Sequence, residues 1–316
     1  MPETPAFLDR VRPNVPDLVV SRAVLPFFLP HRPVRGRLVR LGPLAEALLG
    51  RHRHHPRVAA LAGEALALVA GLASALRFRG TFSLQVKGDG PVPLLHADCT
   101  ELGALRFYAR ARPERLAVLL DATPAPSAAA LFGRGYLAFT VDQGADRERH
   151  QGIVALGGES LEEMALAYFR ESMQLAGLVR LAARPAAAGW RAGALILERI
   201  AADSLSPGHD DAAEAWRTAA ALAATLSDAE LLDDALTPEL LLYRLFHSEG
   251  IVVGQPRPLA YGCRCTRARL SGILEGFAID DLDHMTTDGA IVMTCEFCNL
   301  DFRFSRAEIA GRGRTD

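Results

Sequence analysis

Apolar residues recur with two different periods along the first half of the chain. Alternation of apolar and polar residues predicts β-strands over residues 34–41, 81–86, 92–97, 105–109, 136–141 and 152–156. Residues 18–28 predict an edge strand or an extended arm, because a proline-rich break follows them. Runs rich in Ala and Leu predict helices over 44–49 and 57–76. Since most strands follow one another without regular intervening helices, the pattern favours an α+β fold with an antiparallel sheet over a doubly wound one.

The pattern becomes mainly helical after residue 156. Ser160-Leu-Glu-Glu163 is a capping-box sequence, so we expect a helix from there to about Leu175. Residues 182–193 are rich in Pro, Ala and Gly and predict a loop or a boundary, followed by a short apolar segment. From 209 to 250 the chain has a nearly continuous helical pattern, with Ser227 and Thr237 as N-caps.

The first helix of that stretch, over residues 211–226, is dominated by Ala. Alanine favours helix formation but buries little apolar area, so the helix is expected to pack weakly. Weak packing is typical of an element that detaches under some conditions, and an ordinary connecting helix explains the same residues. We divide the chain into an N-terminal α+β core (1–190), a helical linker (191–255) and a small C-terminal domain (256–316).

Composition limits the classes of partner. A chain of 316 residues, half of them hydrophobic, can bury a substantial core. Its net charge of −2 gives no general reason to expect nucleic acid as a partner, and we interpret the basic run Arg51-His-Arg-His-His55 as a solvated loop before a helix. Residues 1–16 lack a signal-peptide pattern, and no apolar run reaches the roughly 20 residues of a membrane span. We expect a cytoplasmic protein without a membrane partner.

Four of the five cysteines form two close pairs, Cys263-Arg-Cys265 and Cys295-Glu-Phe-Cys298. The pairs lie about thirty residues apart, which is a spacing typical of a tetrahedral zinc site. Four cysteine ligands leave no open coordination position, so the pattern predicts one structural zinc ion and no zinc-bound catalytic water. Cys99 is interpreted as a small buried side chain near the end of a strand.

The chemistry of this site favours redox sensitivity. In a segment of about sixty residues with few large apolar side chains, zinc can supply on the order of 10–16 kcal/mol of folding free energy. The Cys-x-Cys spacing is less common in structural zinc sites than Cys-x-x-Cys. A disulfide across one intervening residue is geometrically unfavourable and tends to be labile. Arg264, Arg267 and Arg269 add positive charge that favours thiolates. Oxidation to disulfides would eject zinc and unfold the segment.

With these residues in view, the chain resembles the heat-shock protein 33 family, which are redox-regulated holdase chaperones. The resemblance covers roughly residues 18–310 and rests on the cysteine pairs and on further segments in the family order. Met173 and the Ala-rich linker depart from the family pattern. The further segments are Phe82-Ser-Leu-Gln-Val-Lys-Gly-Asp-Gly-Pro91, Gly133-Arg-Gly-Tyr136, His150-Gln-Gly-Ile-Val154, Glu159-Ser-Leu161, Tyr168-Phe169 with Ser172 and Gln174, and Leu242-Tyr-Arg-Leu-Phe-His247.

The resemblance implies a chaperone that works without ATP and is inactive while reduced and zinc-bound. Hypochlorous acid, or peroxide with heat, would form the disulfides Cys263–Cys265 and Cys295–Cys298 and release zinc. The linker would then loosen and expose apolar surface that binds unfolding client proteins. The resemblance also implies a homodimer after oxidation and transfer of clients to a foldase system of the DnaK type.

Two other classes of function compete with this interpretation. A zinc-ribbon module that binds RNA or a ribosome would use the same cysteines and the basic run, with steeply salt-dependent affinity. An enzyme would need a catalytic constellation, and the sequence offers no Ser/His/Asp set, phosphate loop or paired carboxylates. Gly88-Asp-Gly90 lacks the Lys-Ser/Thr of a phosphate loop and predicts only a turn. We therefore expect that the chain is not an enzyme.

Overall fold

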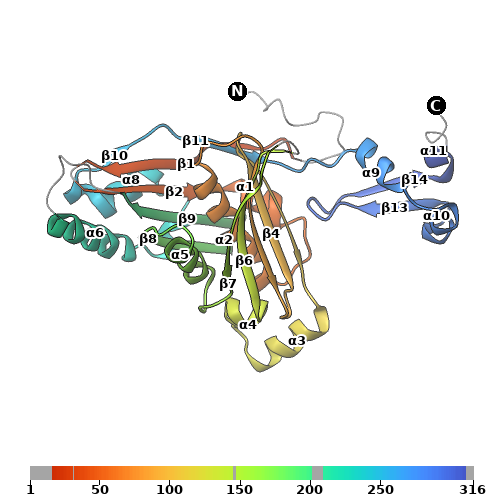
Figure 1. Cartoon of the computed structure of the whole chain (residues 1–316), viewed down its shortest axis with the longest axis horizontal. Coiled ribbons are helices and arrows are strands. Elements are labelled where there is room, and N and C mark those ends of the chain that lie inside the picture. Colours follow the sequence, from red (N-terminus) through yellow and green to blue (C-terminus); the bar gives the residue numbers. More distant parts are fainter. Residues whose placement is uncertain (1–15, 31, 145–146, 201–208, 311–316) are drawn as a thin grey trace.

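A large mixed sheet forms the body of the protein (Figure 1). The computed structural model describes residues 16–30, 32–144, 147–200 and 209–310. Within them, eleven strands form this sheet in the order β7-β6-β3-β4-β5-β11-β1-β2-β9-β8, with β10 beside β1. The strands are β1 (Val19–Leu29), β2 (Val34–Arg40), β3 (Thr81–Gly88), β4 (Leu94–Thr100), β5 (Ala104–Arg110), β6 (Gly135–Asp142), β7 (His150–Ala155), β8 (Gly177–Ala186), β9 (Gly189–Arg199), β10 (Val252–Val253) and β11 (Arg257–Tyr261).

The sheet confirms the α+β class and most of the predicted strands. Its pairs are antiparallel among the described residues, except that β5 and β11 run parallel. Alternation in β3 places Phe82, Leu84 and Val86 in the core, which is the face that the sequence pattern assigns to them. The parallel pair joins a late strand to an early one, and no local sequence pattern indicates such a contact.

The helix α2 (Pro56–Ala73) fills the inner face of the sheet, together with α1 (Pro43–Leu49). It is apolar on nearly all sides, because it packs on strands from both halves of the sheet. By length and composition alone α2 could cross a membrane, but most of its residues are buried in this core. Gly63 allows close approach to the sheet, since a Cβ atom there would lie 2.7 Å from the Cβ of Ala183.

Three helices of the predicted linker cover the opposite face of β1, β2, β9 and β8 (Figure 1). They are α6 (His209–Ala224), α7 (Asp228–Leu231) and α8 (Pro238–Phe246), followed by the short 3-10 helix η1 (His247–Glu249). The predicted N-caps are confirmed, because Ser227 and Thr237 accept hydrogen bonds from backbone amides in the first turns of α7 and α8. We call the apolar contact between these helices and the strands the linker–sheet core.

Two expectations about the strands were wrong. Residues 182–193 form part of the β8–β9 hairpin and not a loop. Their small side chains, such as Ala183 and Ala192, let α2 lie close to the sheet at Gly63. Pro185 is tolerated because β8 is an edge strand on this path. The predicted edge strand over residues 18–28 is β1, which lies inside the sheet between β11 and β2. The three-part division of the chain stays a prediction.

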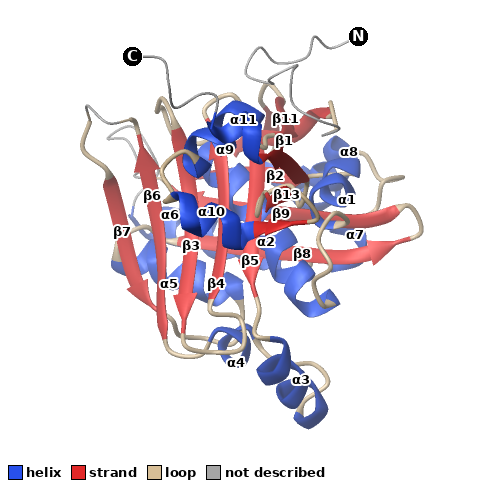
Figure 2. Ribbon diagram, turned by 90° about the vertical axis from the view of Figure 1, so that its right-hand side faces the viewer, coloured by secondary structure: helices blue, strands red, loops and turns tan. Residues whose placement is uncertain are grey.

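The C-terminal end of the chain forms a small three-stranded sheet beside the large one (Figure 1). Its strands are β12 (Thr286–Thr287), β13 (Ala290–Thr294) and β14 (Asp301–Ser305), and its helices are α9 (Arg267–Leu274), α10 (Ile279–Met285) and α11 (Arg306–Ala310). The remaining helices are α3 (Pro113–Ala122), α4 (Ala128–Phe132) and α5 (Leu161–Glu171). The first two lie beyond one end of the large sheet (Figure 2), and α5 packs on β8 and β7. Of these three, only α5 was expected from the sequence.

Candidate metal centre

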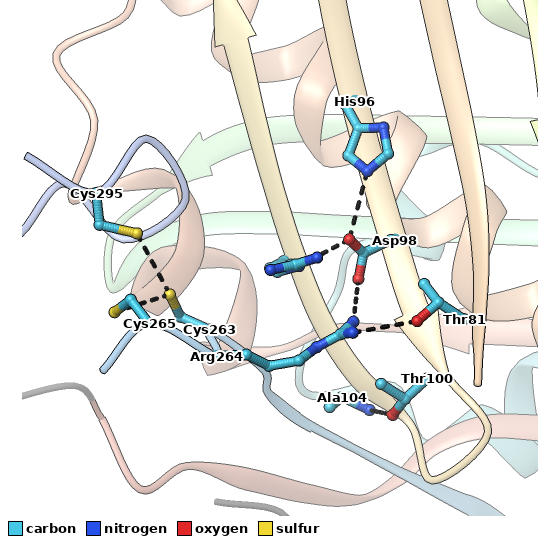
Figure 3. Close-up of polar contacts among 10 residues, drawn as sticks. Thr81, His96, Asp98, Thr100, Ala104, Cys263, Arg264, Cys265 and Cys295 are labelled. Carbon is cyan, nitrogen blue, oxygen red and sulfur yellow. Dashed lines mark hydrogen bonds and ion pairs between the residues drawn. The ribbon is translucent and has the colours of Figure 1, made fainter. Parts of the chain in front are cut away.

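Two segments bring the four cysteines together, and Figure 3 shows three of them, Cys263, Cys265 and Cys295. The first pair follows β11, whose end is tied to the large sheet by a hydrogen bond of 2.7 Å from the Gly262 amide to the Leu105 carbonyl. The second pair lies in the turn between β13 and β14. That turn is closed by the Cys295 amide, which donates to the Leu300 carbonyl, and by Asn299, which adopts the left-handed conformation that Asn tolerates.

The sulfur atoms have the arrangement that a tetrahedral ion requires. All four Sγ atoms lie within 4.8 Å of one another, with Cys263 at 3.3 Å from Cys265 and 3.7 Å from Cys295. Ligands about 2.3 Å from a tetrahedral ion lie about 3.8 Å apart. The four cysteines are buried, so water does not compete strongly for an ion placed between them. We call Cys263, Cys265, Cys295 and Cys298 the four-cysteine cluster.

The thiols influence one another electrostatically. Hydrogen bonds within the cluster, led by the one from Cys263, lower the pKa of Cys295 and raise the pKa of Cys298. The same contacts lower the pKa of Cys263 and raise that of Cys265. Two of the thiols are thus favoured as thiolates, while further negative charge beside them is resisted. A divalent cation removes this resistance, because it allows all four sulfurs to be thiolates. The donor set thus suits a soft or borderline metal ion such as zinc.

Arg264, which separates the first two cysteines, points to the large sheet (Figure 3). Its guanidinium donates to Asp98 Oδ1 at 2.6 Å and to Thr81 Oγ1 at 3.1 Å. Asp98 is almost fully buried on β4 and also accepts from Arg106 Nε at 2.7 Å. The charge of Arg264 was expected from the sequence to favour thiolates, but this charge is paired with the Asp98 carboxylate of the large sheet. This contact ties the metal centre to β4.

The turn of the second cysteine pair also rests on the large sheet, and we call residues 295–298 the knuckle. The Phe297 ring lies 3.9 Å from the Arg106 guanidinium carbon and 4.9 Å from the Tyr108 ring, edge to face. Glu296 Oε1 accepts from Arg110 Nη2 at 2.8 Å. Both cysteine pairs thus contact the same outer face of β4 and β5, while the inner face of these strands packs on α2.

Comparison with known proteins decides the family. A family model described as Hsp33 protein matches residues 23–305. The chain belongs to the Hsp33 family. It is 37% identical over 290 residues to the 33 kDa chaperonin of Caulobacter vibrioides, covering 90% of this chain and 95% of the relative. It is 32% identical over 286 residues to the 33 kDa chaperonin of Pseudomonas fluorescens strain SBW25, covering 90% and 91%.

A solved structure supports the Hsp33 fold independently. The 33 kDa chaperonin of Thermotoga maritima superposes with a TM-score of 0.71 at 21% identity, and the match covers 92% of this chain and 97% of that one. The predicted resemblance to Hsp33 is confirmed, and so is the prediction of a chaperone that is not an enzyme, because the family consists of chaperonins. The pattern of four cysteines, which the structure gathers into one cluster, fits this family.

Several predicted residues of this Hsp33-family chain have structural roles. Cys99 is buried on β4, and its burial raises the pKa of the thiol. Arg267 pairs with Glu308 at 2.9 Å and lies over the Phe304 ring, so it supports the small sheet.

The basic run at 51–55 is not simply a solvated loop, because part of it packs on the metal centre. His52 Nε2 lies 3.3 Å from the Phe297 carbonyl, and the Arg51 carbonyl accepts from Asn299 at 2.7 Å. Burial, followed by the charge of His52, lowers the pKa of His54 to about 4. His54 is therefore neutral at pH 7, which weakens the run as a site for nucleic acid.

Asp98 and Phe297 were missed by sequence reasoning. The signal for Asp98 was the alternation of His96-Ala-Asp98 and Arg106-Phe-Tyr108-Ala-Arg110, which places polar and aromatic side chains on one face of neighbouring strands. Pairing of these strands in register was required to reveal that face.

Asp98→Asn is expected to lower the free energy of unfolding of the reduced chain by about 3–5 kcal/mol. Arg106 and Arg264 would keep their charges without a buried carboxylate between them. Burial alone would raise the pKa of Asp98, but the hydrogen bond from His96 and the charges of the two arginines hold it below its usual range. The stabilisation is therefore present above about pH 4 and is lost as the pH falls further. Urea denaturation at pH 7 and pH 3 measures both effects.

The matched control for this substitution is Asp142→Asn. Asp142 pairs with Arg149 at 2.9 Å on the surface of the same sheet, so its loss should change stability by less than about 0.5 kcal/mol. Equal effects of the two substitutions at pH 7 would contradict the role given to Asp98.

Proposed function

We propose that the chain is a redox-regulated, ATP-independent holdase chaperone whose four-cysteine cluster holds one zinc ion in the reduced, inactive state. The observation that carries this proposal is the meeting of four buried sulfur atoms within 4.8 Å in a chain of the Hsp33 family. When bound, zinc keeps all four sulfurs as thiolates and supplies folding free energy. The cysteines of the cluster are its ligands and also the groups that sense oxidant.

Oxidation converts each cysteine pair into a disulfide, Cys263 with Cys265 and Cys295 with Cys298. Two thiolates lose two electrons for each S–S bond, so four electrons leave in all. Two molecules of hypochlorous acid accept them, each with one proton from water, and become chloride and water. Two molecules of hydrogen peroxide, each with two protons from water, would become water. Disulfide sulfurs carry no negative charge and no longer hold the metal ion. The pairing follows the family resemblance, because sulfurs of different pairs lie equally near in the structure.

The path of the chain suggests how the loss of zinc reaches the linker. β10 and β11 lie between the linker helices and the first cysteine pair, and both strands pair with β1. Release of the pair removes the anchor at the end of β11. The helix α6 buries only alanines completely, with Trp216 and Leu222 half-buried against the same core, whereas α7 and α8 bury Leu and Phe side chains. Since alanine buries little apolar area, α6 would be the element that detaches. Detachment of α6 would expose apolar surface to unfolding client proteins.

The remaining proposals follow from the same switch. The N-terminal core (1–190) and the linker (191–255) would bind clients, and the C-terminal domain (256–316) would sense oxidant. The oxidised chain would form homodimers and pass clients to a foldase system of the DnaK type. A cytoplasmic location would keep the cysteines reduced until oxidative stress occurs.

The proposal is tested by three measurements on the same samples, namely zinc content, free thiols and aggregation of a heat-unfolded client protein. The reduced chain should hold one zinc ion per molecule and leave aggregation unchanged. After treatment with hypochlorous acid it should lose zinc and four free thiols and suppress aggregation without ATP. Equal suppression by the reduced and the oxidised chain would rule out the switch.

A further inference from the structure

The knuckle contacts the large sheet in the manner of a bound peptide. Neither Glu296 nor Phe297 is one of the predicted metal ligands, so the metal does not require these two side chains. Both reach away from the cluster to side chains of β4 and β5. We use the name β4–β5 face for the outward side chains His96, Asp98, Arg106, Tyr108 and Arg110.

The β4–β5 face has separate places for an aromatic ring and for a carboxylate. Phe297 is contacted by the Arg106 guanidinium, by the Tyr108 ring and by the His96 ring, whose centroid lies 6.1 Å away. Cation–π and edge-to-face contacts of this kind favour an aromatic ring over an aliphatic side chain. The neighbouring Glu296 carboxylate accepts two hydrogen bonds from Arg110. The face therefore distinguishes an acidic–aromatic dipeptide from other sequences.

This face is pre-organised by groups that do not belong to the knuckle. Asp98 holds Arg106 by its Nε atom, and His96 lies 3.3 Å from the same carboxylate oxygen. His96 faces Tyr108, and Asp98 faces Arg106, across the β4–β5 ladder. Side chains that are held before binding lose less conformational entropy when a ligand arrives. The face can thus bind an acidic–aromatic segment without rearranging the sheet.

We infer that the β4–β5 face is a binding site for acidic–aromatic segments of unfolded polypeptides, and that the knuckle is the internal ligand that occupies it in the zinc-bound chain. This inference rests on the proposed function, in which loss of zinc unfolds the knuckle and frees the face. Unfolded clients expose aromatic side chains that are buried in their native state. Arg106 and Arg110 select those next to an acidic residue and repel those next to a basic one.

A peptide with the sequence of residues 294–300, in which serine replaces both cysteines, provides the probe. Its binding to the full-length chain is followed by fluorescence anisotropy of a dye at its N-terminus. The oxidised chain should bind the peptide at least tenfold more tightly than the reduced, zinc-loaded chain. Replacing the Phe of the peptide by Ala, or its Glu by Lys, should weaken binding to the oxidised chain at least tenfold.

Variants of the full chain locate the site. Tyr108→Ala and Arg110→Glu should weaken peptide binding to the oxidised chain, whereas Arg184→Ala, an exposed arginine on the strand β8, should leave it unchanged. Phe297→Ala should open the face without oxidant, so that the reduced chain binds the peptide at least fivefold more tightly while it retains one zinc ion. Zinc content checks that this variant is folded.

Aggregation of a heat-unfolded client, measured in parallel, separates this inference from the proposed function. If the oxidised chain suppresses aggregation but binds the Phe→Ala peptide as well as the original one, the site is wrong and the holdase stands. If only the oxidised chain binds the peptide but neither state suppresses aggregation, the site stands and the holdase is wrong. Peptide binding that disappears as the oxidised chain dimerises would assign the face to a second copy and overturn its assignment to clients.

Discussion

Cys298→Ser is expected to abolish stoichiometric zinc binding and to unfold the small C-terminal sheet in the reduced chain. The Cys298 side chain is fully buried, and its sulfur lies 3.5 Å from that of Cys265. A hydroxyl group is a poor replacement for a thiolate at such a site. Structural zinc supplies on the order of 10–16 kcal/mol, which exceeds the whole stability of a typical domain. Zinc content and amide hydrogen exchange over residues 262–310 measure the effect.

The matched control is Cys99→Ala, which removes the one cysteine that lies outside the four-cysteine cluster. Cys99 packs on α2 from β4, so its loss should cost about 1 kcal/mol and leave one zinc ion bound. Slow exchange of β13 and β14 amides in zinc-free Cys298→Ser would show that the small sheet folds without metal. The proposed link between oxidation and unfolding would then fail.

The sequence predicted the parts of this structure that depend on local pattern. Alternation placed β3, and capping residues placed the starts of α5, α7 and α8. Spacing alone brought the four cysteines into one site, because two close pairs leave few other arrangements. These features share one property, which is that residues close in the sequence determine them.

Contacts between distant segments could not be predicted in the same way. The pairing of β11 with β5 joins Ala260 to Ala104, and no periodicity records such a partner. The role of Asp98 depends on its ion pair with Arg264, which is distant in the sequence, so the local pattern around Asp98 indicates only a strand. The β8–β9 hairpin was missed because its residues are small and not the β-branched or aromatic residues typical of strands. Small residues occur here because α2 lies close to the sheet.

Phe246→Ala is expected to lower the free energy of unfolding by about 3–5 kcal/mol and to make the reduced, zinc-loaded chain a chaperone. Phe246 ends α8 and is fully buried in the linker–sheet core. Its ring centroid lies 5.4 Å from that of Phe27 on β1, and Gly36 leaves room for Phe27. Removal of the ring leaves a cavity in the linker–sheet core. Client aggregation in reducing buffer and hydrogen exchange of α8 measure the outcome.

Tyr243→Ala is the matched control, since Tyr243 lies on the same helix but its side chain is 59% exposed. Its loss should change stability by less than about 0.5 kcal/mol and leave the reduced chain inactive. If Phe246→Ala loosens α8 in hydrogen exchange and still does not suppress aggregation without oxidant, detachment of the linker is not what activates the chain. The four-cysteine cluster would then have to act on clients by another route, through surfaces such as the β4–β5 face.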